Sequence, residues 1–440
     1  MTPAPSPLRV YRGALAHGPQ WPPHAAPAAP VRVGYHLWRY PALTTTYIHR
    51  EIAALRAAGL DIVVFAEEAE DAALLDAEGH ALVADAIYLQ PLSAPRRRAL
   101  QRRVLARDRL APVHALAHAR RQPYAPYKNW REDRRVFRHA LALAGCALER
   151  GVTHLHSPWA HLSAFVTLLA AYMAGVPYSV QARASTDLYR TRARGGLAEN
   201  LAHARFVVTN CELNRRFIAA VAPGCRAPVH RVYEGLDPTR FVAAARRRGA
   251  GEPLRVLSVG RLSEEKGFEY LLQALALLRA AGRDVRAVIV GGGAPAYAEQ
   301  LIEARAGLGL DAVVELTGAL PFDRVLEHYQ RADVFALAST LASDGGRDVT
   351  PNVLIEAMAM QLPVVATRMT AIPELVEDRV SGILVPPRHP QALAAALARI
   401  ADDPDLAATL GINGRRRVEE RFDMRRNARQ YLALFDPSRS

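Results

Sequence analysis

Short apolar runs alternate with amphipathic segments along most of this 440-residue chain. The first run, residues 31–36, is followed by a helical pattern that ends at Gly59 and then by a second apolar run at residues 61–66. This alternation is typical of strand–helix units in which parallel strands form a sheet and helices cover its faces. The pattern therefore predicts an α/β fold.

The apolar runs form two series, which predicts two doubly wound, Rossmann-like domains in tandem. In the first series, strands are expected at residues 31–36, 61–66, 86–90, 152–156, 178–182 and 206–210. In the second series, strands are expected at residues 254–260, 286–292, 312–318, 333–339 and 363–367. Doubly wound sheets bind ligands outside the carboxyl ends of their strands, so we expect the functional site in a cleft between the two domains.

The domain boundaries follow from local composition. The charged, glycine-containing segment 243–253 separates the two series and is typical of a linker. We therefore predict a first domain at residues 31–242 and a second at residues 254–414, with a C-terminal helix at residues 415–440 that packs back on the first domain. Residues 1–30 are rich in proline and alanine and are expected to form a disordered leader.

The overall composition narrows the class of protein. Half of the residues are hydrophobic, which excludes wholesale disorder. The three cysteines show no metal-ligand spacing and indicate a reducing cytoplasm, and no signal peptide is expected. The uncharged stretch 162–180 is just long enough for a transmembrane helix, but its polar residues, Gly175 and Pro177 predict a buried helix followed by a strand instead.

Positive charge is concentrated in one segment. The formal net charge is +13, and residues 95–138 contain 14 Lys or Arg against three acids, a net of +11. Arginines alternate with leucine and valine at residues 96–110, which predicts a basic amphipathic helix. Such a helix can be a solvated face, lie on anionic lipid or bind nucleic acid. We place nucleic acid last because aromatic stacking residues are sparse there.

The segment 344–367 predicts a glycine-rich loop, a helix and a short apolar strand. Thr350 is a good N-cap and Pro351 is well tolerated at the first helical position, so we expect the helix to begin there. Its first free amides, on Asn352 and Val353, would lie at the positive end of the helix dipole. That position suits a phosphate group.

Two acidic residues belong to the same segment. Asp348 lies eight residues before Glu356, whose helical neighbours are almost all apolar. A carboxylate in such surroundings is costly unless a polar group meets it. The alternative is a glutamate at the helix boundary that simply reaches solvent, and the segment alone does not decide between the two.

A second polar motif follows the predicted strand at residues 254–260. It continues from Gly260 through Arg261 to Lys266, and a helical pattern follows. Two cations at a strand–helix junction would neutralise a diphosphate, although a turn with incidental charge is the simpler alternative. The cluster Gly291, Gly292 and Gly293 after the next strand would let the backbone approach a ligand closely.

Together these residues resemble the retaining family-4 glycosyltransferases of the GT-B fold. The resemblance covers nearly the whole chain from Val31, with VGRLSEEKG and DVTPNVLIE as its main motifs. The resemblance implies that Arg261 and Lys266 contact the diphosphate of a nucleotide sugar. It also implies that Glu356 holds the ribose and that Asp348 orients the transferred sugar. The diphosphate would be lined by Gly260, Gly292 and the amides of Thr350, Asn352 and Val353. The family usually has glutamate where this chain has Asp348.

The first domain is similar to a subgroup that builds bacterial exopolysaccharides. The similarity lies in RYPALTTTYIHREIAAL, HLHSPWAHLSA and YSVQARASTDLY. It implies that Thr44, Thr45 and Thr46 approach donor or acceptor and that His156 belongs to the acceptor side. Relatives commonly have a histidine where this chain has Arg183, so Arg183 would contact the transferring sugar or phosphate.

Three histidines of the first domain are candidate metal ligands. His154, His156 and His161 are close enough in sequence for a metal site, but no neighbouring carboxylate or cysteine completes one. We therefore expect no metal and no cofactor. Cys211 lies near a helix start without an assigned base, and we expect a buried, inert thiol.

The resulting prediction is a metal-independent, hexosyltransferase-type enzyme. It would move a sugar with retention from a nucleotide-diphosphate sugar to a hydroxyl of a glycan or lipid-linked acceptor, in exopolysaccharide or cell-surface glycan synthesis. We expect it in the cytoplasm, with a peripheral position on the inner face of the plasma membrane if residues 95–138 bind anionic lipid. The alternatives are a non-catalytic scaffold or sugar-binding protein at the membrane, and an epimerase or phosphorylase of the same fold. A dinucleotide-dependent dehydrogenase is disfavoured because the first strand of each domain lacks a GxGxxG turn.

Overall fold

The structure, a computed structural model, leaves several segments of the chain undescribed. It describes residues 30–41, 46–70, 77–90, 92–121, 130–183, 185–189, 194–243, 248–249 and 251–439. The predicted leader therefore lies, apart from Pro30, outside the described residues. The same holds for part of the predicted linker 243–253.

The chain divides into two compact units. The first unit comprises residues 1–210, 214–232 and 428–440, and the second comprises residues 211–213 and 233–427. The chain passes from the first unit into the second at residue 233, before the predicted linker. It passes back into the first unit at residue 428, later than the predicted residue 415. The return is late because helix α17 (Pro404–Arg421) remains packed in the second unit, where a Cβ on Gly411 would lie 2.2 Å from the carbonyl oxygen of Gln361.

The first unit contains a seven-stranded sheet in which every described pair of strands is parallel. Its strands are β1 (Arg32–Arg39), β2 (Asp61–Glu68), β3 (Ala86–Tyr88), β4 (His154–Ser157), β5 (Tyr178–Gln181), β6 (Val207–Thr209) and β7 (Val229–Arg231). The order is β3-β2-β1-β4-β5-β6-β7. The direction of strand succession therefore reverses between β1 and β4, which is the doubly wound arrangement.

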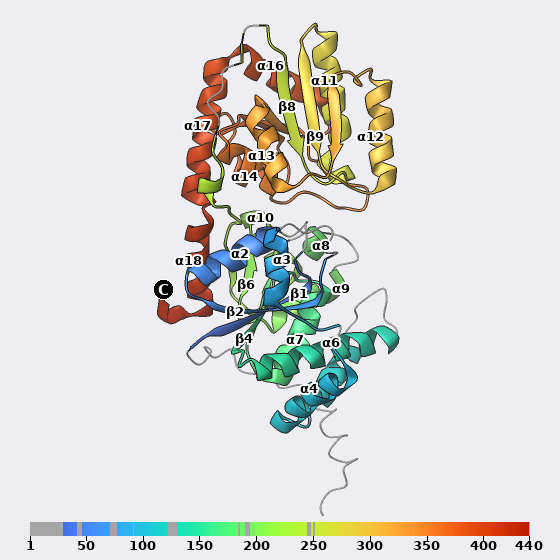
Figure 1. Cartoon of the computed structure of the whole chain (residues 1–440), viewed down its shortest axis with the longest axis vertical. Helices are drawn as coiled ribbons and strands as arrows, with labels where there is room; N and C mark the ends of the chain where they lie inside the picture. The colour runs from blue at the N-terminus through green and yellow to red at the C-terminus, as the bar shows by residue number, and fades with distance from the viewer. Residues whose placement is uncertain are drawn as a thin grey trace, which may run out of the picture. The chain divides into compact units, whose positions relative to one another are not determined.

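Helices cover both faces of this sheet (Figure 1). The helices of this part of the chain are α2 (Thr46–Ala57), α3 (Ala77–Asp85), α4 (Ala94–Arg107), α5 (Ala111–Arg121), α6 (Trp130–Glu149), α7 (Leu162–Ala174), α8 (Ser185–Leu188), α9 (Arg194–Ala202), α10 (Glu212–Val221) and α18 (Met424–Phe435). Of these, α4 packs on α6 rather than on the sheet. Every residue of α7 from Ser163 onward is buried, and β5 follows the helix, so the uncharged stretch is a buried helix and a strand as expected. Within the described residues, no helix has both the length and the apolar content needed to cross a membrane.

The C-terminal helix α18 completes the core of the first unit. Tyr431 and Phe435 are buried in one cluster with Val33, Tyr35 and other residues of the first sheet. The Phe435 ring centroid lies 5.3 Å from those of His156 and Phe206. Aromatic pairs at such distances add to the area that they bury, so the last helix is an integral part of this core.

The second unit repeats the architecture with a six-stranded parallel sheet (Figure 1). Its strands are β8 (Leu254–Val259), β9 (Val285–Val290), β10 (Val314–Gly318), β11 (Val334–Leu337), β12 (Val364–Thr367) and β13 (Ile383–Val385). Besides α17, its helices are α11 (Phe268–Ala280), α12 (Pro295–Gly307), α13 (Phe322–Arg331), α14 (Asn352–Ala359), α15 (Ile372–Leu375) and α16 (Pro390–Asp402). The order β10-β9-β8-β11-β12-β13 reverses between β8 and β11. The predicted α/β fold with two doubly wound domains is confirmed.

Two strands were missed by the sequence analysis. Both β7 and β13 have three residues and lie at the edge of their sheets, paired only with β6 and β12. β7 reads VHR, with a single apolar residue, and the apolar run of β13 is bounded by Gly382 and Pro386, so neither is marked as a strand by its pattern. The strands form because a neighbouring strand supplies the hydrogen bonds.

The predicted basic helix corresponds to α4. Its apolar positions Leu100 and Val104 are buried. They face α6, where a Cβ on Gly145 would lie 2.6 Å from Cβ of Leu100. The apolar side of α4 is therefore already occupied by α6, and only its basic side remains exposed.

Candidate functional site

The candidate site lies at the point in the second unit where the strand order reverses. Strands β8 and β11 are neighbours in the sheet, but their chain connections lead to opposite sides of it. The loops that follow them therefore begin side by side at the carboxyl edge of the sheet, which is where doubly wound proteins bind ligands. Lys266 belongs to the loop after β8 and Asp348 to the loop after β11.

Close backbone packing holds these two loops together. Residues Glu264–Lys266 form a 3₁₀ turn that ends at Gly267, which has a φ of 64°. A Cβ at Gly267 would lie 2.1 Å from the carbonyl oxygen of Ala338 in the other loop. Glycine is required here both for the left-handed backbone and for the approach of the second loop. The position of Lys266 is thus set by the backbone of both loops.

The central polar contact joins Lys266 to Asp348. Nζ of Lys266 donates to Oδ1 of Asp348 at 2.7 Å, and the Ser339 hydroxyl donates to Oδ2 at 2.7 Å. Both charged side chains are 13% exposed. The hydroxyl of Thr370 also donates to the carbonyl oxygen of Asp348. Asp348 is therefore held in place through its side chain and its backbone.

The second predicted cation, Arg261, has a different environment. Its Nη2 donates to Oε1 of Glu265 at 2.7 Å, and its side chain is largely exposed. Burial by itself raises the pKa of Glu265, but hydrogen bonds, including the one from Arg261, outweigh it and lower the pKa. The structure thus gives each predicted cation its own carboxylate, and it brings only Lys266 next to Asp348.

The predicted glycine cluster packs against the loop after β8. Gly291 has a φ of 151°, and a Cβ there would lie 1.8 Å from the carbonyl oxygen of Gly260. The amide of Leu262 donates to the carbonyl oxygen of Gly292 at 2.8 Å. Gly260 and Gly292 therefore lie in adjacent loops at the same edge of the sheet, where side chains would force the backbones apart.

Helix α14 begins one residue later than the sequence predicts. Pro351 is its N-cap, with an extended backbone and no side-chain cap bond, so Thr350 is not the cap. The first helical residues are Asn352 and Val353, and the first backbone bond in this turn runs from the Leu354 amide to the Pro351 carbonyl oxygen at 3.0 Å. The N-cap is Pro351 rather than Thr350 because Pro351 has the extended backbone of an N-cap residue and is not itself helical. The first turn contains no acid, so the positive helix end keeps its attraction for an anion.

The side chain of Asn352 has a partner outside the helix. Its Nδ2 donates to Oε2 of Glu234 at 2.9 Å, and Glu234 belongs to the same unit. This bond orients the start of α14 against the segment that enters the unit. The backbone amide of Asn352 is not used by the bond.

Glu356 is buried rather than exposed at the helix boundary. It is 8% exposed on α14, and the Tyr329 hydroxyl lies 3.3 Å from its Oε2 and 3.2 Å from the carbonyl oxygen of Val353. A polar group therefore meets the carboxylate, as burial of a charge requires. The solvent alternative left open by the sequence is wrong.

Arg183 belongs to the first unit and is buried there. Its Nη1 donates to Oε2 of Glu51 at 3.2 Å, and the guanidinium lies 4.6 Å from the Tyr47 ring centroid. Gln181 also donates to Glu51, at 2.7 Å. In this arrangement the predicted contact of Arg183 with a sugar or phosphate would have to compete with Glu51. That predicted role remains a prediction.

His156 is fully buried, and its place on the acceptor side stays a prediction. Its Nδ1 lies 2.7 Å from the Ser179 hydroxyl, and Nε2 of His154 lies 2.6 Å from the same oxygen. Burial lowers the pKa of His154 to about 3 and that of His156 well below its ordinary value. Alternate residues of β4 face the same side of the sheet, so both imidazoles enter the core. The nearby His161 caps α7, where its side chain accepts from the Ser163 amide.

The remaining predictions fall on the first loop. Thr44 and Thr45 lie outside the described residues, and Thr46 is the first residue of α2. Cys211 is buried, as expected.

Sequence reasoning missed three partners of the site residues: Ser339, Tyr329 and Glu51. Ser339 could have been found because it closes a predicted strand at the same sheet edge as Gly260. Tyr329 and Glu51 carry no such signal, since they lie on helices that meet their partners only by packing.

Comparison with known proteins gives consistent results. A family model described as "Glycosyl transferases group 1" matches residues 253–403, which contain the Lys266, Asp348 and Glu356 site. An amylovoran biosynthesis glycosyltransferase of Erwinia amylovora is 35% identical over 217 residues, 49% of this chain and 53% of the relative. The α-D-kanosaminyltransferase of Streptomyces kanamyceticus is 30% identical over 283 residues, 59% of this chain and 70% of the relative. The chain spans about half the length of the first relatives that it matches.

Solved structures share the fold along most of the chain. Sucrose-phosphate synthase from Thermosynechococcus elongatus superposes with a TM-score of 0.70 at 21% identity, covering 92% of this chain and 99% of that one. Anabaena Alr3699/HepE in complex with UDP-glucose superposes with a TM-score of 0.68 at 18% identity, again over 92% and 99%. At these identities the likeness concerns the fold.

Proposed function

Because the chain belongs to the group 1 glycosyl transferases, we propose that it transfers a sugar from a nucleotide-diphosphate sugar to a hydroxyl group, with retention at the anomeric carbon. The proposed acceptor is a glycan or a lipid-linked glycan in exopolysaccharide or cell-surface glycan synthesis. The role of the Erwinia relative in amylovoran biosynthesis supports this choice of acceptor.

The observation that carries the proposal is the cluster of Lys266, Asp348 and the start of α14 around the reversal point of the second sheet. An ammonium group and outward-facing helix amides are what a diphosphate needs when no metal neutralises it. Arg261, on the same loop as Lys266, would supply the second positive charge. The complex of the Anabaena protein with UDP-glucose, a protein of the same fold, supports a nucleotide sugar as donor.

The chemistry assigned to these residues is stabilisation of a leaving group. Transfer breaks the bond between the anomeric carbon and a diphosphate oxygen and forms a bond to the acceptor hydroxyl oxygen, which loses its proton. Negative charge grows on the diphosphate, and positive charge grows on the sugar. Preorganised cations and amides stabilise the former. Asp348, fixed by Ser339 and Thr370, would orient the sugar, and Glu356 would hold the ribose hydroxyls.

A panel of nucleotide sugars tests the proposal. The purified chain is incubated with each donor and a mixture of glycan acceptors, and released nucleotide is measured. We expect one donor to be consumed by the wild type and far more slowly by Glu356→Ala. Tyr329→Phe is the matched variant, since it removes the partner of Glu356 but keeps its carboxylate. A chain that binds no donor and releases no nucleotide would instead be the scaffold or sugar-binding alternative.

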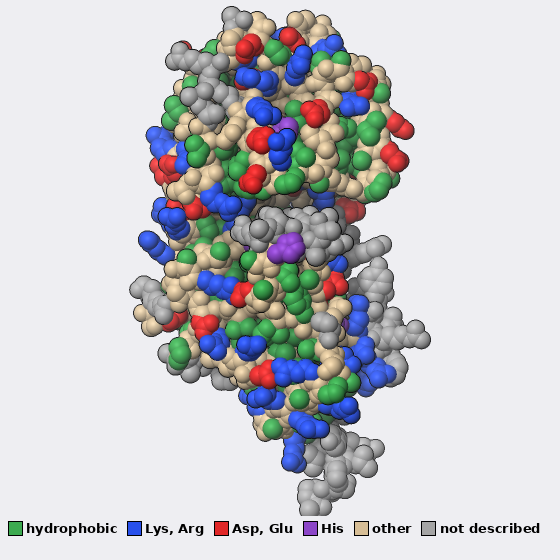
Figure 2. All heavy atoms as spheres, in the orientation of Figure 1, with side chains coloured by type: hydrophobic (Ala, Val, Ile, Leu, Met, Phe, Trp, Pro, Cys, Tyr) green, Lys and Arg blue, Asp and Glu red, His purple; other side chains and the backbone are tan. Residues whose placement is uncertain are grey.

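The basic side of α4 supports a membrane surface as an additional proposed partner. Arg96 and Arg103 pair with Glu149, and Arg107 lies near the carbonyl oxygen of Met173. Within the described residues, the exposed arginines Arg98, Arg102 and Arg109 have no acidic partner. Figure 2 shows Lys and Arg side chains gathered over this part of the first unit. Because α6 covers the apolar side of α4, the proposed attraction is electrostatic rather than insertion into the bilayer.

A further inference from the structure

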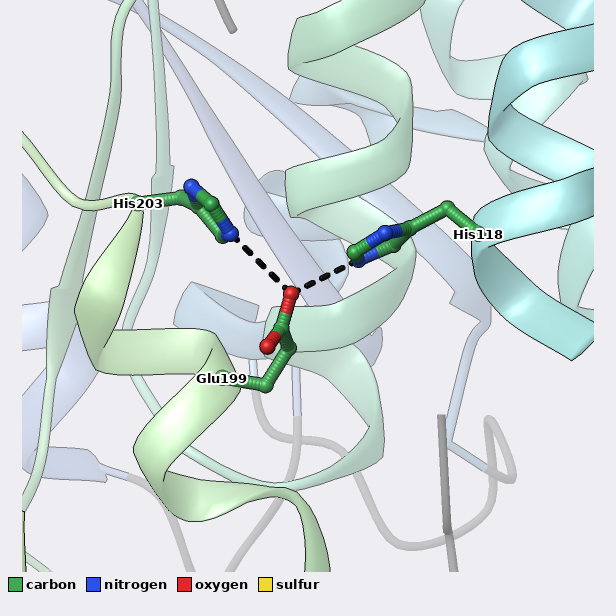
Figure 3. A group of neighbouring side chains, drawn as sticks. All are labelled: His118, Glu199 and His203. Atoms are coloured by element: carbon green, nitrogen blue, oxygen red, sulfur yellow. Dashed lines mark hydrogen bonds and ion pairs between the residues drawn. The ribbon is translucent and has the colours of Figure 1, made fainter. Parts of the chain in front are cut away.

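Two imidazoles of the first unit converge on a single carboxylate oxygen (Figure 3). Nε2 of His118, on α5, lies 2.7 Å from Oε1 of Glu199. Nε2 of His203, directly after α9, lies 3.0 Å from the same oxygen. The three ligand atoms all lie within 4.8 Å of one another. The residues come together because α5 and α9 both pack on α7.

The donor set matches a borderline divalent cation. Two imidazole nitrogens and one carboxylate oxygen form a common protein set for Zn²⁺, which binds them at about 2.0–2.2 Å. Tetrahedral bonds of that length place ligand atoms about 3.3 Å apart. The observed separations of 2.7 and 3.0 Å would therefore open by a few tenths of an ångström on metal binding. Glu199 and His203 are four residues apart, a spacing that places both side chains on one side of a helix.

The surroundings leave room for a further ligand. The side chain of His118 is 9% exposed, whereas those of Glu199 and His203 are 21% and 25% exposed. His118 forms the inner wall of the cluster, with its ring centroid 6.2 Å from that of Phe165. Burial alone raises the pKa of Glu199, but hydrogen bonds from His118 and His203 outweigh it and lower the pKa to about 2. The carboxylate is thus charged and accessible from one side.

We propose that His118, Glu199 and His203 bind one Zn²⁺ ion, with water as the fourth ligand. The ion would be structural and would fasten α5 to α9. The site shares no residue with the proposed donor site, because Lys266, Asp348 and Glu356 belong to the other unit. The proposal is therefore independent of the proposed function.

A second His–Glu–His group in the same unit provides an internal comparison. Glu67 contacts His36 through Oε1, at 3.2 Å, and His139 through Oε2. Each imidazole uses a different oxygen, so the two nitrogens do not meet at one ligand atom. Among the described residues, only the His118 group brings three such ligand atoms within reach of one ion. The Glu67 group is a hydrogen-bonded network and serves as the control.

The test is a zinc titration of the untagged full chain after removal of metal with a chelator. Zn²⁺ is added in competition with a chromophoric chelator, and bound metal is counted by elemental analysis. We expect one tight site per chain. His203→Ala and Glu199→Gln should each weaken it at least about tenfold, since loss of even outer-shell partners costs that much. The matched control His139→Asn should leave the affinity unchanged.

Two further measurements separate metal binding from folding. Circular dichroism checks that each variant is folded, and Zn²⁺ should raise the melting temperature of the wild type and of His139→Asn only. Co²⁺ should give the visible absorption of a tetrahedral site in the same two proteins. The proposal is overturned if His203→Ala and Glu199→Gln bind Zn²⁺ as the wild type does. It is equally overturned if the wild type has no stoichiometric site.

Discussion

Nζ of Lys266 lies 2.7 Å from Oδ1 of Asp348, although the two residues are 82 positions apart in the chain. The pair spans the loops after β8 and β11, and each side chain is 13% exposed. A diphosphate bound at the start of α14 would need the same ammonium group. Ligand and carboxylate would therefore compete for Lys266, and this competition makes the proposed site testable in several ways.

Asp348→Asn should raise the affinity for free UDP or GDP by about fivefold, because it removes a competing charge worth about 1 kcal/mol from a partly buried pair. The same variant should lose sugar transfer, since the proposed orienting group is gone. Calorimetric titration with both nucleotides measures the first effect, and nucleotide release from the donor measures the second. The control is Asp402→Asn, which removes a carboxylate paired with Arg283 on the surface of the same unit. Weaker nucleotide binding by Asp348→Asn would contradict the competition.

The double variant Arg261→Ala with Lys266→Ala should lower kcat/KM at least about 100-fold, because it removes both cations proposed to stabilise the leaving group. Steady-state nucleotide release measures this loss. The matched control replaces Arg324 and Arg331, two exposed arginines of α13, and should transfer sugar at the wild-type rate. Wild-type activity in the first double variant would remove the basis of the proposed mechanism.

Gly267→Ala should destabilise the second unit by about 3 kcal/mol or more, since a Cβ would meet the Ala338 carbonyl oxygen at 2.1 Å. Gly282→Ala is the matched control: its φ of 75° is also positive, but a Cβ there meets nothing within 4 Å. It should cost only the backbone strain of about 1 kcal/mol. Urea unfolding of both variants compares the two costs. Equal costs would show that the loops after β8 and β11 do not press on each other.

Stability should fall as the pH drops below about 6.5, the ordinary pKa of an unfolded histidine. The pKa of His154 is lowered to about 3 in the folded state, because burial disfavours the charged ring. The unfolded chain therefore binds the proton more readily. At pH 5 this lowers the free energy of unfolding by about 2 kcal/mol relative to a pH well above 6.5. The stability contributed by the neutral ring is complete above pH 6.5 and is lost progressively towards pH 3.

Urea unfolding at pH 7 and pH 5 measures this loss. His154→Phe should lose less stability than the wild type between the two pH values, because its ring does not titrate and can keep the stacking on Phe206. His389→Asn is the control, since it removes an exposed imidazole but keeps a side-chain acceptor for the Ala392 amide. An unchanged pH dependence in His154→Phe would show that His154 is not the group responsible.

Replacing Arg98, Arg102 and Arg109 by alanine should weaken adsorption to vesicles that contain phosphatidylglycerol. Each surface arginine contributes about 1 kcal/mol to attraction by an anionic membrane, so the triple variant should bind more than tenfold less tightly. Sedimentation with vesicles at low and high salt measures this. The matched control replaces Arg286, Arg324 and Arg331 of the second unit. Equal loss in both variants would assign the attraction to net charge rather than to α4.

The donor-site residues illustrate how far local sequence can lead. Lys266 and Asp348 each follow a strand that the apolar pattern of the sequence predicts. Parallel strands bring their carboxyl ends to the same edge of the sheet. Their closeness could therefore be predicted in outline. The burial of Glu356 could not, because its partner Tyr329 lies on another helix and no spacing connects the two.

The first unit shows the limit more clearly. A motif assigns His156 to the acceptor side, but it does not predict that His156 enters the core with His154, where it contacts Ser179 and Phe435. Arg183 is directed towards Glu51. Both orientations depend on segments that are distant in sequence.

The sequence by itself determined the two doubly wound domains, the alternation of most of their strands with helices, and the polar loops at the carboxyl ends of the strands. These features are local: they follow from apolar periodicity, glycine positions and helix starts within short windows. Only the tertiary structure decided that Lys266 faces Asp348, that His156 is buried and that His118 meets Glu199 and His203. Those contacts join segments that approach only when helices and strands pack, and side-chain burial and charge pairing are set at that stage.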